Sequence, residues 1–504
     1  MLKRNLIANY IGQAWTALMG LAFVPLYIKY LGMEAYGLIG LFALLNAWLS
    51  LFEMGMMPTL NREMARFTAG NRSPQSIRDL LRTIEIIAIV IAFIIAVIVT
   101  ASSHWLASNW LKSEKLPIEV VSQAFMIMGF VTSLRFIEGV YQSTITGLQK
   151  QVLLNILLAA SASLRGVGAV IILAYVSPTI QAFFIWQGLI SILALVLLVS
   201  ITYSSMPSTG RRSHFSIIEM RGVWKFSIGV LSITFLALLL TQIDKILLSK
   251  LLTLHDFGYY TLAATVSGSL FMLIRPITQA YYPRMCELYA SNDLNQLNLV
   301  YHHAAQLVSV IAGSFAIVII FNSEPLLLLW TQDPDLVSRT APILKILMLG
   351  NLINGLMWIP YQAQLAHGWT SLAIRTNILV VLVIVPSIIW FTPRYGVIGA
   401  AWVWVSLNVG YLFFSAKYIF RYILLKQRWP WYMQDILAPL FAGTCAALIM
   451  KIIFPIPVTF FSLIFQIGFS AFLVLLSSIS AAAHLRKYLL CKVYPKLFTK
   501  RIRL

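Results

Sequence analysis

The sequence predicts an all-α integral membrane protein with about fourteen transmembrane helices. Its 504 residues are 60% hydrophobic and only 11% charged, whereas roughly 25% of the residues in a soluble domain are charged. The segment IIAIVIAFIIAVIVTA at 86–101 carries no charge, and an apolar run of about 20 residues is long enough to cross a bilayer as a helix. Because the bilayer offers no water to the backbone, membrane segments form helices or closed barrels. Long uninterrupted apolar runs favour helices.

The predicted spans follow one another with short connections. The first six are 5–28, 36–58, 80–101, 118–143, 152–176 and 180–203. The next six are 222–244, 258–281, 303–321, 338–365, 370–390 and 396–416, and the last two are 433–451 and 459–482.

The distribution of Lys and Arg predicts the orientation, because these residues concentrate in cytoplasmic loops. With a cytoplasmic N-terminus, the inner segments hold 23 of them and the outer segments 6. The outer loop NSEPLLLLWTQDPD at 322–335 holds three acids and no base. Both termini are therefore predicted to be cytoplasmic. The net charge is +20, and the positive residues lie between apolar segments. This pattern indicates contact with membrane lipid and no nucleic-acid partner.

An internal repeat is predicted from matching segments. YIKYLGMEAYG at 27–37 is similar to LSKLLTLHDFG at 248–258, and Gly258 lies 221 positions after Gly37. Gly147 and Gly368 are also 221 positions apart. This offset covers six spans, an even number, so the second copy has the same orientation as the first and the repeat is parallel.

The repeat predicts two six-helix lobes around a central cavity, with two further helices at the C-terminal end. Such lobes can open a cavity to either side of the membrane in turn. The predicted divisions are an N-lobe at 1–205, a cytoplasmic linker at 206–220, a C-lobe at 221–425, spans thirteen and fourteen at 426–485, and a basic cytoplasmic tail at 486–504.

Charged residues inside the spans indicate the function of the cavity. A charge at the bilayer centre costs about 2.5 to 3.5 kcal/mol on insertion scales, so it usually faces a cavity or a partner. Arg suits an anionic headgroup, since its planar fork binds phosphate oxygens in pairs. The predicted cationic cavity is formed by Arg165, Arg135, Arg275, Lys345 and Arg375.

Other interpretations of these charges remain open. Arg135 and Glu138 lie three residues apart on one helix face, so they can neutralise each other. Lys345, Arg375 and Arg275 can extend to an interface.

The segment FVPLYIKYLGMEAYGLIGLFALLNAWLSLFEMGMMPTLNREMARF at 23–67 resembles the N-terminal signature of bacterial O-antigen flippases, the Wzx-type polysaccharide transporters. The closest parts are YLG, EAYGL and LNREMAR. The signature commonly has Asp in span two, where this chain has Glu53.

The resemblance implies membership of the multidrug/oligosaccharidyl-lipid/polysaccharide exporter superfamily. It further implies that undecaprenyl-diphosphate-linked oligosaccharide units are moved to the outer leaflet of the bacterial inner membrane. The substrate and membrane lipid are the expected partners, and a polysaccharide polymerase and chain-length machinery are further candidates. From the motif, Glu53, Arg62 and Glu63 are assigned to gating or headgroup capture, and Glu138 is added to this group as a coupling candidate. Positive-inside anchoring is an equal explanation for Arg66.

The sequence predicts no enzyme and no cofactor. It has no nucleophile paired with a base, no phosphate-binding loop and no metal-ligand spacing, and its three cysteines are far apart. A drug or cation exporter of the same fold is one alternative, but span one contains no acid. A membrane-embedded glycosyltransferase or polymerase is another, although it would need a longer outer loop. The related flippase for the peptidoglycan lipid precursor is a third.

Overall fold

The computed structural model describes residues 2–52, 56–68, 73–207, 211, 213–217, 235, 238–239, 241–425, 427–454 and 460–487. The chain divides into two compact units, Met1–Gly258 and Tyr259–Leu504. Within the described residues, eleven helical segments are long and apolar enough to cross a membrane. The predicted all-α membrane fold is therefore confirmed.

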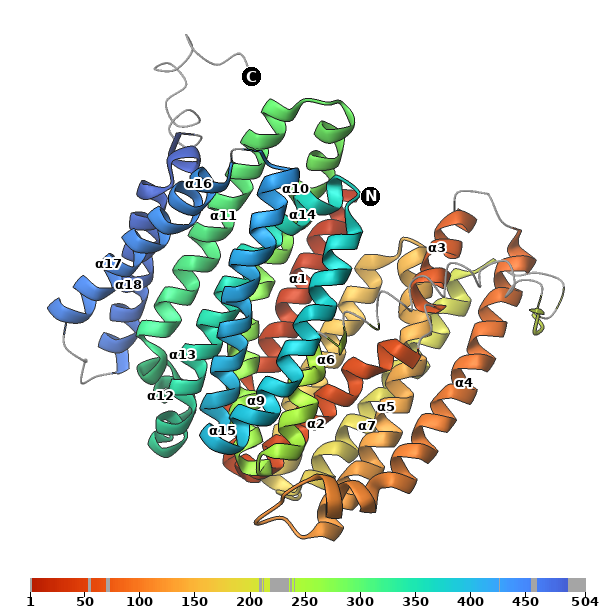
Figure 1. Cartoon of the computed structure of the whole chain (residues 1–504). Helices are drawn as coiled ribbons and strands as arrows, with labels where there is room; N and C mark the ends of the chain where they lie inside the picture. Colours follow the sequence, from red (N-terminus) through yellow and green to blue (C-terminus); the bar gives the residue numbers. More distant parts are fainter. Residues whose placement is uncertain are drawn as a thin grey trace. The chain divides into compact units, whose positions relative to one another are not determined.

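The first unit is a bundle of long helices joined by short connections (Figure 1). Its elements are α1 Leu2–Ala22, α2 Val24–Phe52, α3 Met56–Thr68, α4 Pro74–Trp105, the π-helix η1 Leu106–Trp110, α5 Ile118–Gly147, α6 Gln151–Tyr175 and α7 Ile180–Ser205. The helix α9, Leu254–Gly268, begins at the end of this unit.

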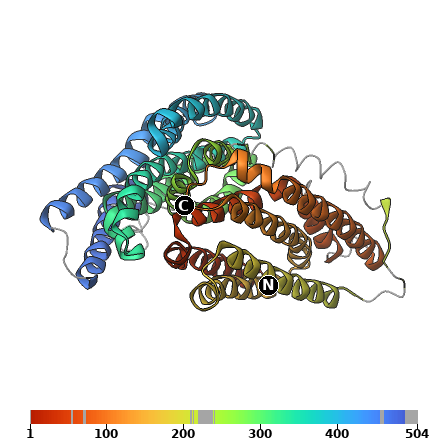
Figure 2. The ribbon, with the colours of Figure 1, turned by 90° about the horizontal axis from the view of Figure 1, so that it is seen from below.

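The second unit continues with helices of the same kind. They are α10 Leu270–Ala290, α11 Leu294–Phe321, α12 Ser323–Thr331, α13 Pro334–Leu356, α14 Trp358–Ala366, α15 Thr370–Tyr422, α16 Arg428–Pro430, the π-helix η2 Trp431–Leu437, α17 Ala438–Ile453 and α18 Phe460–Ala481. The last two long helices run side by side and both pack against α11 (Figures 1 and 2).

The helix boundaries explain why the structure gives eleven candidates while the sequence predicts fourteen spans. Spans eleven and twelve appear as the single helix α15, which breaks at Gly396, where φ is +60°. Span one corresponds to α1, which is helical but is not among the eleven candidates. Most of span seven, 222–244, lies outside the described residues. The number fourteen therefore remains a prediction.

The connection predicted between spans one and two, 29–35, is helical. The structure continues α2 through it, with a break at Gly32, where φ is +82°. Glycine adopts this left-handed conformation without the penalty that a Cβ would impose. The chain can therefore change direction within an almost continuous helix.

The helix α4 shows how a span divides between protein and lipid. Ser73 caps its start by accepting a hydrogen bond from the Ser76 amide, and Pro74 occupies the first turn, where its missing N–H costs nothing. Leu80 and Leu81 are fully buried in a core shared with α3, α5 and α7. Phe93 is 70% exposed, as expected of a side chain that faces hydrocarbon. One face of α4 thus holds the bundle together while the other is available to lipid.

The two matching segments of the repeat cross each other at close range. A Cβ on Gly37 would lie 2.5 Å from the carbonyl oxygen of Leu254, and a Cβ on Gly258 would lie 2.6 Å from that of Met33. Leu254 follows Met33 by 221 positions, the same offset that relates the two glycines. Gly37 approaches Leu254, and Gly258 approaches Met33, so the two contacts are equivalent when each residue is shifted by 221 positions. This reciprocal contact is what a local two-fold relation between the two short segments produces.

We expect Gly37→Ala and Gly258→Ala to destabilise the protein, because the added methyl group meets a backbone carbonyl that cannot rotate away. Overpacking of this kind costs about 1–3 kcal/mol. The thermal unfolding midpoint of the full chain in nanodiscs measures the effect. Gly20→Ala is the matched control, since a Cβ there meets nothing within 4 Å. Equal midpoints for Gly37→Ala and Gly20→Ala would contradict the close approach.

Candidate functional site

Three helices of the first unit bring a buried acid and two partly buried arginines together. Arg165 on α6 donates from Nη2 to Glu138 Oε1 on α5 at 3.1 Å and to Ser191 Oγ on α7 at 3.0 Å. The side chain of Glu138 is 4% exposed and that of Arg165 is 22% exposed. A buried carboxylate needs such a partner, because an unpaired charge in the interior is costly. The ion pair therefore ties α5 to α6 and orients the guanidinium.

Arg135 completes the cluster from the turn of α5 before Glu138. Its Nη2 donates to Gln187 Oε1 at 3.1 Å, and its guanidinium carbon lies 4.7 Å from the centre of the Phe42 ring. Gln187 also donates to the Arg165 carbonyl at 3.4 Å. Glu138 thus bonds across helices to Arg165, and Arg135 is held by an amide and an aromatic face.

This arrangement, which we call the α5–α7 cluster, has more positive charge than negative. It contains two guanidinium groups, on Arg135 and Arg165, and the carboxylate of Glu138. The Nε atoms of both arginines are buried, and the structure gives them no hydrogen-bond partner among the described residues. Unsatisfied buried donors are unfavourable. The cluster is therefore chemically suited to accept a further anion.

An apolar hollow lies on the same two helices, α5 and α7. Its volume is about 370 Å³. It is lined by Met126, Ile127, Phe130, Val131, Ile185, Gly188, Leu189 and Ile192. The first unit thus carries a cationic cluster on α5, α6 and α7 and an apolar surface on α5 and α7, a combination that suits an amphipathic molecule.

The residues assigned from the signature motif lie on α3. Glu63 is fully buried and pairs with Arg62 at 2.7 Å and with Arg66 at 3.3 Å. Both arginines are partly exposed. Glu53 lies outside the described residues. The structure therefore shows one buried acid fixed by two basic neighbours, and a gating role for it stays a prediction.

The remaining predicted cations belong to the second unit. Lys345 on α13 pairs with Glu324 on α12 at 2.6 Å. The hydrogen bond to this lysine lowers the pKa of the Glu324 carboxyl. Arg275 on α10 and Arg375 on α15 are exposed. The structure thus does not bring these three cations together, and their role in a cavity remains a prediction.

Sequence reasoning missed the uncharged members of the α5–α7 cluster. Gln187, Ser191 and Phe42 hold the two arginines in position. Gln187 and Ser191 are polar residues four positions apart on α7, which places them on the same helix face. That spacing in an otherwise apolar span was the available signal, and nothing in the sequence distinguished Phe42 from its aromatic neighbours.

The fold defines a multi-pass, all-α membrane protein. The chain belongs to the polysaccharide biosynthesis protein family, whose model matches residues 29–332. A relative from Shigella flexneri, provisionally described as an O-antigen transporter, is 20% identical over 402 residues, which cover 80% of this chain and 93% of the relative. The predicted resemblance to Wzx-type transporters is confirmed.

Solved structures show the same fold. The lipid II flippase MurJ in an inward closed conformation matches with a TM-score of 0.70 and 15% identity, over 98% of this chain and 99% of that chain. An inward-facing multidrug resistance transporter of the MATE family, in the MOP superfamily, matches with a TM-score of 0.66 and 13% identity, over 80% of this chain and 94% of the other. The chain therefore shares the all-α fold of these two proteins.

Proposed function

We propose that the protein is a flippase that moves undecaprenyl-diphosphate-linked oligosaccharide repeat units from the cytoplasmic to the outer leaflet of the bacterial inner membrane. Membership of the polysaccharide biosynthesis family supports this function. The observation that carries the substrate class is the α5–α7 cluster, where two partly buried guanidinium groups lie close to a single carboxylate that pairs with only one of them, Arg165. A diphosphate supplies the anionic oxygens that paired guanidinium nitrogens bind best.

In this proposal Glu138 acts as a resident counter-ion. It satisfies Arg165 at 3.1 Å before substrate arrives, so the arginine is never left unpaired inside the membrane. The diphosphate then competes for Arg165 and bonds to Arg135, and Glu138 recovers Arg165 when the substrate leaves. Exchange between two anions keeps binding reversible, which a flippase requires in order to release its cargo.

The lipid portion of the substrate is apolar and the sugar portion polar. The apolar hollow on α5 and α7 is proposed to contact the isoprenoid chain near the diphosphate. Alternating access of the two lobes would carry the headgroup across. The distribution of Lys and Arg supports a cytoplasmic location for both termini. The protein itself breaks no covalent bond in this scheme.

Deleting the gene in a cell that needs it for surface polysaccharide tests the proposal. We expect surface polysaccharide to disappear while complete lipid-linked repeat units accumulate on the inner leaflet, and the wild-type gene to restore both. A leaflet-resolved measurement of the repeat units is the readout. If unpolymerised units instead reach the outer leaflet after deletion, the flippase assignment is wrong and the protein acts in polymerisation.

A further inference from the structure

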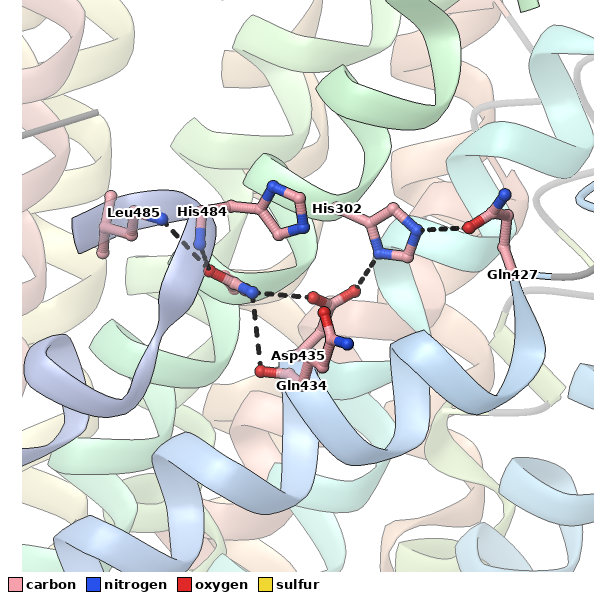
Figure 3. Close-up of polar contacts among 7 residues, drawn as sticks. His302, Gln427, Gln434, Asp435, His484 and Leu485 are labelled. Carbon is pink, nitrogen blue, oxygen red and sulfur yellow. Dashed lines mark hydrogen bonds and ion pairs between the residues drawn. The ribbon is translucent and has the colours of Figure 1, made fainter. Parts of the chain in front are cut away.

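A buried polar cluster in the second unit joins α11 to the C-terminal helices (Figure 3). Its centre is a contact of 2.5 Å between His302 Nδ1 on α11 and Asp435 Oδ2 on η2. Asp435 is 0% exposed and His302 is 5% exposed. A carboxylate so deeply buried requires a charged or hydrogen-bonded partner, and the π-helix that carries it is a geometry often found at functional sites.

Each end of this pair has a second partner. His302 Nε2 lies 2.9 Å from Gln427 Oε1, and Asp435 Oδ1 accepts a hydrogen bond from Gln306 Nε2 at 2.9 Å. Gln306 Oε1 accepts the backbone N–H groups of His484 and Leu485, at 2.9 and 3.1 Å, in the segment after α18. One network therefore connects α11, η2 and the segment after α18, as Figure 3 shows.

The contacts suit a protonated histidine. The two ring nitrogens of His302 lie beside Asp435 Oδ2 and Gln427 Oε1, and an imidazolium, whose two nitrogens both donate, bonds to both oxygens. Loss of one proton would set a nitrogen lone pair against an oxygen, or force the Gln427 amide to turn. It would also leave the Asp435 carboxylate buried without a cation, which is strongly unfavourable.

Further titratable and charged groups surround the pair, from α11, α16, η2 and the segment after α18. They are Tyr301, His303, Arg428, Tyr432, His484 and Lys487. The His484 ring stacks on the His302 ring, with 5.5 Å between centroids and 8° between planes. Burial, followed by the charge of His302, lowers the pKa of His484. The neighbouring ring therefore stays neutral while His302 holds the proton.

We propose that His302 and Asp435 form a proton-binding site that fastens the C-terminal helices α17 and α18 to α11. With the proton bound, the ion pair holds η2, and Gln306 holds the segment after α18. When the proton leaves, the ion pair is lost and both attachments weaken. The attachment is thus strongest at acidic pH and is released as the pH rises above the ordinary histidine range, near 6.5. This site is independent of the substrate proposed above.

Hydrogen–deuterium exchange of the full chain in nanodiscs tests the site without any substrate. The amides of His484 and Leu485 are the reporters, because both donate to Gln306. Their protection factors, corrected for the intrinsic pH dependence of exchange, are measured from pH 6 to pH 9. We expect protection to fall by roughly tenfold across this range, the size of losing one hydrogen bond.

Three variants complete the test. His302→Gln should give weak protection that does not change with pH, and His104→Gln, an exposed histidine on α4, should behave as wild type. Gln427→Glu adds an anion beside Nε2 and should move the transition up by about one pH unit or more. Constant protection in wild type, an unchanged transition in His302→Gln, or no shift in Gln427→Glu would each overturn the proposal. Because Gln427 is only partly buried, its variant remains informative if His302→Gln fails to fold.

Discussion

Replacing Arg165 and Glu138 together, as Arg165→Met with Glu138→Leu, is expected to leave a folded protein that no longer transports. Exchanging a buried ion pair for apolar side chains of similar size is often neutral, or stabilising by about 1–4 kcal/mol. Arg165→Ala alone leaves the 4% exposed Glu138 carboxylate without its cation, and breaking a pair in this way costs about 3–5 kcal/mol. A loss of transport in the single variant could therefore come from misfolding, whereas a loss of transport in the folded double variant could not.

Two measurements on each variant decide the outcome. The amount of folded protein in the membrane reports stability, and inner-leaflet repeat units in a complemented deletion strain report transport. Arg165→Lys should fold normally but transport poorly, because a single ammonium group cannot bond a diphosphate through a planar fork. Arg284→Ala with Glu287→Ala removes an exposed ion pair on α10 and should leave both measurements unchanged. Normal transport by the Arg165→Met/Glu138→Leu variant would show that the pair is only structural.

The sequence predicted the class of fold because that class depends on averages over many residues. Long apolar segments, the bias of Lys and Arg toward one side of the membrane, and the offset of 221 positions between matching segments can be recognised without knowing any individual contact. The exact boundaries depend on backbone conformation at single residues. Gly32 lies within the predicted connection 29–35 and Gly396 begins predicted span twelve, but only the φ values of +82° and +60° show that each helix is interrupted at a single glycine.

The candidate site was only partly predictable for a related reason. Arg165 was found because a charge among small apolar residues is unusual in a span. Its partner was not, since the bond to Glu138 joins positions 27 residues apart on different helices. The contact between His302 and Asp435 joins positions 133 residues apart. A single sequence indicates which side chains are costly to bury, but helix packing decides which of them meet.

The signature motif also contains a residue whose role is structural. Glu34, in the segment YLGMEAYG, is 5% exposed. Its carboxylate accepts the backbone N–H groups of Glu114, Lys115 and Leu116 at 2.6, 2.9 and 3.1 Å. In the same loop, the carbonyl of Lys112 accepts a hydrogen bond from the backbone N–H of Leu254 at 2.9 Å. Glu34 thus holds the loop that contacts Leu254 at the start of α9.

We expect Glu34→Ala to destabilise the first unit by about 3 kcal/mol or more, because three backbone donors lose a charged acceptor and each such loss costs about 1–3 kcal/mol. Glu34→Gln should cost less, since its remaining oxygen still accepts while its amide nitrogen opposes a donor. Glu114→Ala, an exposed acid in the same loop, should change little. Thermal unfolding in nanodiscs ranks the three variants, and exchange at the amides of 114–116 locates the effect. If Glu34→Ala and Glu114→Ala were equally stable, the carboxylate would not be what holds this loop, and the motif residue would need a different explanation.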